Sequence, residues 1–360
     1  MSTAPLRVLI VDDSAVVRKL LADGLAGQKD IQVVGAAADP YIARDMMIQH
    51  RPDVLTLDIE MPRLDGLSFL AKVMEHRPMP VIVISSLTKV GSAASVEALR
   101  LGAIDVIAKP GGPSSVGEVT AQLLRRLRAL RQAPIRFAAP TAAVNEPVAA
   151  PAAPPAARAV ARPASGLVVI GASTGGTRAI ETVLTRLPAQ VPPILITQHM
   201  PAGFTKAFAS RLDTICPMHV REAEHGELLQ AGTAYVAPGD HHLVVERTGL
   251  QLRAALRQGP PVHFQRPAVD VLFHSVARLQ GIPTVALLLT GMGADGAEGL
   301  LALRQAGAET IAQDEHSCVV FGMPREAIQL GAAMHVMNLV QMPGAILDHL
   351  QRRSPRAAAS

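Results

Sequence analysis

The sequence predicts two α/β domains, each built on a parallel β-sheet, joined by a linker rich in alanine and proline. Short continuous apolar runs alternate with helix-like patterns on both sides of that linker, which is typical of parallel sheets covered on both faces. The chain has 360 residues, enough for two or three domains. Residues 133–164 contain 14 alanines, 7 prolines and no glycine, a composition that builds neither a core nor long helices.

Composition sets the expected boundaries and excludes several classes of protein. We expect a first domain over residues 1–125, a linker over 126–164, a second domain over 165–352 and a disordered tail over 353–360. Hydrophobic residues make up 49% of the chain and charged residues 18%, which excludes wholesale disorder. The two cysteines, Cys216 and Cys318, are too few and too far apart for a disulfide scaffold or a zinc finger.

Charge and hydropathy argue against nucleic-acid and membrane partners. The net charge is only +4, and the arginine-rich stretch from Arg125 to Arg128 is interpreted as a solvated helix face. Aromatic residues make up 2% of the chain, too few for a base-stacking platform. The apolar run that ends at Val11 meets Asp12 at once, and no other run approaches the ~20 residues of a membrane span. We therefore expect no nucleic-acid binding, no membrane insertion and a cytoplasmic location.

The first domain contains five strand-like runs separated by helical patterns. The expected strands are Arg7–Val11, Ile31–Gly35, Val54–Leu57, Val81–Ile84 and Asp105–Ala108. Five β/α units in about 125 residues fit a flavodoxin-like, five-stranded parallel doubly wound sheet.

Polar residues follow these strands where the carboxyl ends of a parallel sheet converge. Asp12 and Asp13 follow the first strand, Asp58 the third, Ser85 ends the fourth and Lys109 follows the fifth. Three carboxylates would repel one another without a cation, and oxygen ligands favour Mg²⁺. With a lysine and a hydroxyl to hold a phosphoryl group, Asp58 is the expected nucleophile for an acyl phosphate. A single aspartate there could be a solvated loop residue; five such positions in order favour a site.

The segments VDDSAVVRKL, LTLDIEMPRLDGL, VISS and AKP resemble the receiver domain of two-component response regulators over residues 5–125. The resemblance implies transfer of a phosphoryl group from a histidine kinase to Asp58. It also implies Mg²⁺ held by Asp13, Asp58 and the backbone carbonyl of Glu60, with Asp12 assisting through water. Ser85 and Lys109 would then be the switch residues.

The second domain begins with a strand, Leu167–Ile170, that runs into Gly171-x-Ser173-x-Gly175 and a helix. This pattern matches a nucleophile elbow, in which glycines allow a sharp turn that exposes the serine oxygen. A glycine-rich turn before a helix also binds phosphates, so the motif alone leaves a nucleotide-binding loop open. Neither GK[ST] nor GxGxxG spacing is present.

Two further strand ends favour a hydrolase. Ile194–Thr197 leads to His199, and Val285–Thr290 leads to a glycine-rich segment with Asp295. In a parallel sheet, His199 could take the proton of Ser173 while Asp295 orients the imidazole. The order Ser, His, Asp differs from the usual α/β-hydrolase order. His241 and His242 could line a cleft, but we interpret them as a solvent-facing turn.

The stretches IGASTGGT, LITQHMPAGFT, YVAPGDHH, RPAVDVLFHSVA, LLLTGMGADGAEGLLALRQAGA and CVVFGMPREAI resemble the catalytic domain of CheB-type protein-glutamate methylesterases. The resemblance implies a doubly wound α/β domain with Ser173 as nucleophile, His199 as general base and Asp295 as the orienting acid. It implies that the Met292 backbone N–H contributes to the oxyanion hole. The sequence departs from the family pattern at Ala268, where serine is usual, and at Gln265, where histidine is frequent.

The same resemblance implies the reaction and its partners. Methyl-accepting chemoreceptors would be the substrate, demethylated at glutamyl esters and deamidated at glutamines, with no cofactor for hydrolysis. A histidine kinase of the CheA type would be the phosphodonor. A related non-flagellar chemosensory pathway with the same esterase chemistry is an alternative. So is an output domain that binds a ligand or DNA, although the sequence after the linker contains no helix-turn-helix pattern.

Overall fold

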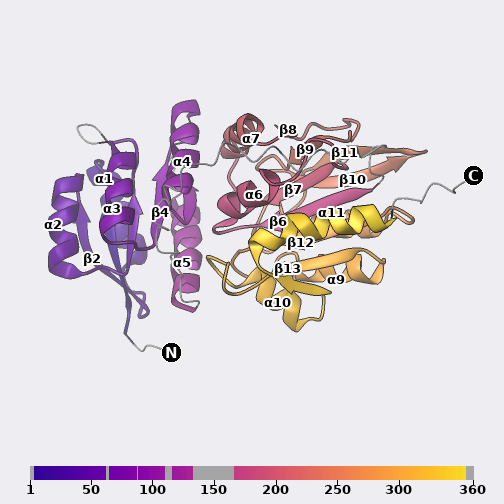
Figure 1. Ribbon diagram of the computed structural model, residues 1–360. Helices are drawn as coiled ribbons and strands as arrows, with labels where there is room; N and C mark the ends of the chain where they lie inside the picture. The colour runs from indigo at the N-terminus through magenta and orange to yellow at the C-terminus, as the bar shows by residue number, and fades with distance from the viewer. Residues whose placement is uncertain (1–3, 62–64, 87, 110–115, 133–165, 354–360) are drawn as a thin grey trace, which may run out of the picture. The chain divides into compact units, whose positions relative to one another are not determined.

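The computed structural model describes residues 4–61, 65–86, 88–109, 116–132 and 166–353 (Figure 1). These residues form two α/β units, one before residue 133 and one after residue 165. Among the described residues, no helix is both long and apolar enough to cross a membrane.

The first unit is a five-stranded parallel sheet with helices between the strands. Its elements are β1 (Leu6–Val11), α1 (Ala15–Leu25), β2 (Ile31–Ala37), α2 (Pro40–His50), β3 (Val54–Leu57), α3 (Gly66–His76), β4 (Val81–Ser85), α4 (Lys89–Leu101), β5 (Asp105–Ala108) and α5 (Val116–Gln132). The strand order is β2-β1-β3-β4-β5, which confirms the predicted flavodoxin-like sheet. The four residues of β3 are all buried, as expected for a strand covered on both faces.

The order of the strands reverses between β1 and β3. Strand β2 pairs with one edge of β1, and the next strand in the chain, β3, pairs with the other edge of β1. The loops that leave β1 and β3 therefore diverge and open a crevice at the carboxyl edge of the sheet. Asp12 and Asp58 are the first residues of those two loops, which places them in that crevice.

Helix α5 corrects the predicted start of the linker. It runs to Gln132, so residues 126–132 belong to the first unit and not to the linker. Arg126 donates through Nε to Asp105 Oδ2 at 2.7 Å, and Leu127 is fully buried. Arg128 pairs with Asp30 at 2.9 Å, so part of the arginine-rich face is used in ion pairs. The predicted boundary at residue 125 followed the end of the receiver-like segments, whereas the helix continues through Leu127 and Leu130 to Gln132. Residues 133–165 and 354–360, which include the rest of the linker and most of the predicted tail, lie outside the described residues.

The second unit is larger and also has a parallel sheet. Its elements are β6 (Leu167–Ala172), α6 (Gly176–Leu184), β7 (Ile194–Gln198), α7 (Phe204–Ile215), β8 (His219–Glu222), β9 (Thr233–Val236), β10 (His242–Thr248), β11 (Gln251–Arg257), α8 (Val269–Ala277), β12 (Thr284–Leu288), α9 (Ala297–Gln305), β13 (Glu309–Gln313), α10 (Met323–Gln329), β14 (His335–Met337), a 3₁₀ turn (Leu339–Gln341) and α11 (Met342–Arg353). Seven strands pair in the order β14-β13-β12-β6-β7-β9-β8, and β10 and β11 form a separate antiparallel hairpin.

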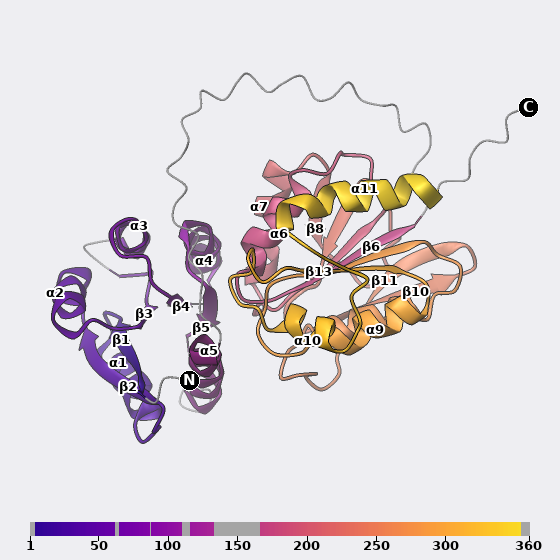
Figure 2. The same cartoon turned by 60° about the horizontal axis from the view of Figure 1, so that its bottom comes forward.

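Helices cover both faces of this seven-stranded sheet. In Figure 2, α6 and α11 lie above the sheet and α9 and α10 below it. The core on one face gathers side chains from β6, β7 and β12 with those of α8, among them Val169, Leu195, Phe273 and Leu288. Because β6 is followed by β7 on one side and pairs with β12 on the other, the strand order also reverses at β6. The predicted doubly wound fold is thus confirmed, and its crevice lies at the ends of β6, β7 and β12.

Helix α8 packs closely against β6 at Gly171. A Cβ atom added there would lie 2.2 Å from Val269 Cγ1, so any side chain would push the helix off the strand. We predict that Gly171→Ala lowers the free energy of unfolding of the second unit by about 1–3 kcal/mol. Gly344→Ala is the matched control, because a Cβ atom at this position of α11 meets nothing within 4 Å. The control should raise stability by about 0.5–1 kcal/mol. Thermal unfolding of the two variants tests this, and equal midpoints would contradict the packing argument.

Candidate functional site

Ser173 lies on a sharp turn between β6 and α6. Gly175, the last residue before α6, has φ of +77°, a left-handed conformation that glycine adopts at no steric cost. The Ser173 N–H donates to the Thr290 carbonyl at 3.0 Å, and the Ser173 carbonyl accepts from Gly176 N–H at 2.7 Å. These bonds fix the backbone on both sides of the serine at the carboxyl edge of the sheet, as the nucleophile-elbow pattern predicts.

His199 follows β7 and lies opposite Ser173. The parallel register pairs Ala172 with Gln198, so the next residues along the two strands, Ser173 and His199, are neighbours across the ladder. The His199 N–H donates to the Ala172 carbonyl at 3.1 Å, and the Gln198 side chain donates to the Ser173 carbonyl at 2.8 Å. Both Ser173 and His199 are buried. Strand register therefore brings the serine and the histidine together.

The imidazole of His199 is held by Asp295. His199 Nε2 lies 2.6 Å from Asp295 Oδ2, and both side chains are almost fully buried. Nδ1 of His199 has no hydrogen-bond partner among the described residues. An ionised carboxylate only accepts, so Nε2 carries the proton in this pair and Nδ1 is the nitrogen that can accept one.

Asp295 also caps helix α8. Its carboxylate accepts from the N–H of Val269 at 2.7 Å and from the N–H of Asp270 at 2.9 Å. Burial alone would raise the pKa of Asp295, but the bonds from His199 and from the two N–H groups outweigh it and hold the pKa below its usual value. The carboxylate is thus an anion that the positive end of α8 stabilises.

Capping by Asp295 explains how the departure at Ala268 is tolerated. Ala268 is the N-cap residue of α8, and its side chain offers no hydrogen bond to the helix. A serine there would supply the usual cap, typically ~1 kcal/mol. In this chain the free N–H groups of the first turn bind Asp295 instead. The structure offers no comparable explanation for Gln265, whose backbone lies in a tight turn.

The loop after β12 presents a backbone donor beside the serine. A Cβ atom added to Gly291 would lie 2.8 Å from Ser173 Cβ, which shows how closely this loop passes Ser173. Gly291 N–H is bonded to the Val320 carbonyl, whereas Met292 N–H donates to no acceptor in the described parts of the chain. Ser173 N–H is already used by Thr290, so Met292 is the candidate donor for an oxyanion.

His242 is buried, which contradicts the expected solvent-facing turn. Its Nδ1 accepts from Ala268 N–H at 3.2 Å and its Nε2 lies 3.1 Å from the Pro260 carbonyl. The ring therefore joins the loop before α8 to the start of β10, a long-range role that the dipeptide His241-His242 does not reveal. His241 is partly exposed and bonds weakly to the Gly239 carbonyl at 3.4 Å.

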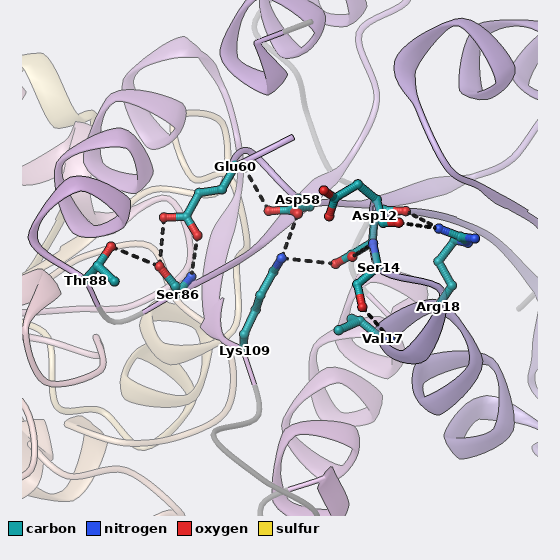
Figure 3. A network of polar contacts seen from close by, with 10 residues as sticks. Asp12, Ser14, Val17, Arg18, Asp58, Glu60, Ser86, Thr88 and Lys109 are labelled. Atoms are coloured by element: carbon teal, nitrogen blue, oxygen red, sulfur yellow. Dashed lines mark hydrogen bonds and ion pairs between the residues drawn. The ribbon is translucent and has the colours of Figure 1, made fainter. Parts of the chain in front are cut away.

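In the receiver-like unit, the side chains of Asp12, Asp58 and Lys109 lie close together (Figure 3). Asp12, Asp13 and Asp58 each offer a carboxylate oxygen within 4.8 Å of the others. Lys109 Nζ lies 2.6 Å from Asp58 Oδ2 and 3.5 Å from Asp12 Oδ2. Ser85 is fully buried, and its carbonyl accepts from the Lys109 N–H at 2.8 Å. The five predicted residues, from the ends of four strands, therefore lie at one edge of the sheet.

Charge and burial adjust two of these groups. Burial raises the pKa of Asp12 above its usual value, against the attraction of Lys109. For Lys109, burial would lower the pKa, but its hydrogen bond to Asp58 and the attraction of both carboxylates raise it above its usual value. The lysine is thus a firmly held cation between two acids.

The donor set fits a hard divalent cation. Asp12 Oδ2 is buried and accepts no hydrogen bond within the described residues. Three carboxylates, one with a buried oxygen that accepts no hydrogen bond and has only the 3.5 Å ion pair with Lys109, match the oxygen ligands that Mg²⁺ prefers. Glu60 N–H donates to Asp58 Oδ1 at 2.9 Å, while its side chain accepts from Ser86 Oγ at 2.8 Å. Sequence reasoning missed this Ser86–Glu60 bond, for which the adjacent serines of VISS were the only signal.

Comparisons with known proteins identify the family of each unit. A family described as CheB methylesterase matches residues 168–346, and one described as response regulator receiver domain matches residues 8–120. The chain is 51% identical over 354 residues to the protein-glutamate methylesterase/protein-glutamine glutaminase 2 of Bordetella avium (strain 197N), covering 98% of this chain and 99% of the relative. It is 47% identical over 334 residues to the enzyme of the same description from Syntrophus aciditrophicus (strain SB), covering 93% and 96%.

A solved structure resembles the second unit. The catalytic domain of the Thermotoga maritima CheB methylesterase has a TM-score of 0.50 and 39% identity, and the match covers 51% of this chain and 98% of that one. This structure, the near full-length relatives and the two family matches all support the same family for the chain. The chain belongs to the CheB family of protein-glutamate methylesterases/protein-glutamine glutaminases, with a response-regulator receiver domain ahead of the esterase domain.

Proposed function

We propose that this chain hydrolyses glutamate methyl esters on chemoreceptors and deamidates receptor glutamines, with Ser173, His199 and Asp295 as its catalytic triad. The observation that carries the triad is the buried His199–Asp295 pair on the strand end next to Ser173. The membership of the CheB family supplies the reaction. No cofactor takes part in the proposed hydrolysis.

Acylation begins at Ser173. As its Oγ attacks the ester carbonyl, Nδ1 of His199 takes the hydroxyl proton, and the Nε2–H bond to Asp295 stabilises the resulting imidazolium. The N–H of Met292 donates to the oxyanion. The tetrahedral intermediate collapses, the C–O bond to methoxide breaks, and Nδ1 returns the proton so that methanol leaves.

Deacylation uses the same groups in reverse. Water gives a proton to Nδ1 and attacks the glutamyl-serine ester, and the Ser173 oxygen leaves with that proton. The products are a free glutamate side chain and the original enzyme. A glutamine side chain is close in shape to the methyl ester, so the same first step releases ammonia in place of methanol.

Phosphorylation of the receiver domain is the proposed control. A histidine kinase of the CheA type supplies the phosphoryl group, and Asp58 Oδ accepts it. Asp13, Asp58 and the Glu60 carbonyl would hold Mg²⁺, with Asp12 nearby, and the ion would neutralise charge on the phosphoryl oxygens. Lys109, whose Nζ lies 2.6 Å from Asp58 Oδ2, and the Ser85 hydroxyl would bind a phosphorylated Asp58.

The triad assignment is tested by removing the nucleophile and the base. Ser173→Ala and His199→Ala should each lower kcat/KM for methanol release from methylated receptors by more than about tenfold, a loss above ~1.4 kcal/mol. Their matched controls are Ser210→Ala and His219→Ala, at exposed positions of the same unit. A triad variant that keeps more than a tenth of the wild-type activity would contradict the assignment.

The phosphorylation site is tested with a small phosphodonor and Mg²⁺. We expect one label on the wild type, none on Asp58→Asn, and full labelling of Asp23→Asn, which changes an exposed aspartate on α1. A chelator should abolish labelling. The phosphodonor should stimulate methanol release by the wild type and by Asp23→Asn but not by Asp58→Asn. Labelling that survives in Asp58→Asn would show that another residue is the acceptor.

A further inference from the structure

A strained two-residue turn lies next to the catalytic acid. Val262 and Gln265 exchange both backbone hydrogen bonds, at 3.0 and 2.8 Å, and so close a turn with His263 and Phe264 at its centre. These two residues have φ of +50° and +62°. Glycine, asparagine and aspartate are the usual residues in this left-handed region, and two large side chains in succession carry a steric cost. Such strain persists only where surrounding contacts impose it.

The contacts that impose the turn come from the active site. His263 Nε2 lies 3.0 Å from Asp270 Oδ2, and Asp270 Oδ1 accepts from Gly299 N–H at 2.7 Å. The Asp270 N–H in turn donates to the catalytic Asp295. His263, Asp270 and Asp295 each have a ligand-type atom within 4.8 Å of the other two. The turn is therefore linked through Asp270 to Asp295, the carboxylate that contacts His199.

A second set of contacts fixes the base of the same loop. Arg266 donates to the Gly259 carbonyl at 2.7 Å and also pairs with Asp240. The buried His242 ring contacts the Pro260 carbonyl. The loop before α8 is thus held at its base by Arg266 and His242 and at its tip by the contact of His263 with Asp270.

The side chain at this tip is an exposed phenylalanine. Phe264 is 76% exposed, whereas Phe204, Phe208 and Phe273 of the same unit are buried. An exposed aromatic ring forgoes the favourable transfer of apolar surface out of water. Leu250 is also exposed, at 93%, but it lies in the β10–β11 turn after Gly249. Among the exposed large apolar side chains of the described residues, Phe264 alone has a backbone φ in the left-handed region.

We propose that Phe264 is a specificity-determining residue of the esterase, and the inference rests on the proposed function. Its ring packs against apolar side chains, or aliphatic stems, of the receptor segment that carries the methylated glutamate. The partner is a protein segment, because an exposed apolar ring gains from packing against apolar groups, which a receptor segment offers in addition to the ester itself. Phe264 thereby contributes binding energy that distinguishes a receptor from a small ester, without taking part in the bond-breaking step.

Phe264→Asn tests this, because asparagine tolerates the left-handed conformation but has no ring. With methylated receptors in membranes, KM should rise about tenfold with kcat unchanged, the pattern of lost uniform binding. With a short peptide that carries one glutamyl methyl ester, both constants should stay within twofold. The midpoint of thermal unfolding should not fall, since strain is relieved. Phe264→Tyr keeps the ring and should behave as the wild type, and Leu250→Ala is the matched control for an exposed apolar residue.

Three results would overturn the inference. One is an unchanged KM for receptors in Phe264→Asn. Another is an equal loss of activity on receptor and short peptide, which would mean that the turn only supports the triad. The third is an equal rise in receptor KM for Leu250→Ala. A wild-type chain that releases no methanol from either substrate would instead overturn the proposed function, and this inference with it.

Discussion

The arrangement of the esterase site depends on the hydrogen bonds that the buried carboxylate of Asp295 accepts. A carboxylate removed from water is costly unless it is paired and hydrogen-bonded. Here its donors are His199 Nε2 and the first two N–H groups of α8. One charge thus joins the end of β7 to the helix that packs against β6. Because the same bonds assign the proton to Nε2, they leave Nδ1 as the nitrogen that acts as base in the proposed mechanism. One carboxylate thus both caps the helix and orients the imidazole.

Both domains place their chemistry at the point where strand order reverses. In the receiver domain this point lies between β1 and β3, and in the esterase domain it lies at β6. The two crevices solve the problem of buried charge differently. In the esterase domain, backbone N–H groups and a histidine satisfy one aspartate. In the receiver domain, Lys109 is shared by Asp12 and Asp58, and the Asp12 oxygen that faces Lys109 accepts no hydrogen bond. The proposed phosphorylation of Asp58 would reorganise this second arrangement.

Sequence patterns predicted the features that depend on residues close together in the chain. The strands were recognised because they are continuous apolar runs, and Asp58, Ser173 and His199 because each directly follows such a run. Long-range contacts were not accessible in this way. The extent of α5 depends on the burial of Leu127 and the pairing of Arg126 with Asp105. The capping of α8 by Asp295 and the burial of His242 join segments about 25 residues apart. The left-handed backbone at His263 and Phe264 could not be predicted, because histidine and phenylalanine are not the residue types that a turn with positive φ usually contains.

The protonation state of His199 is the most direct test of this account. In the ¹⁵N-histidine NMR spectrum of the full chain at neutral pH, the His199 resonances can be assigned by comparison with His199→Ala. We predict a protonated Nε2 and an unprotonated Nδ1, as the 2.6 Å contact to Asp295 requires. The same tautomer should be lost in Asp295→Ala. A wild-type His199 that carries its proton on Nδ1 would contradict the arrangement of base and acid described above.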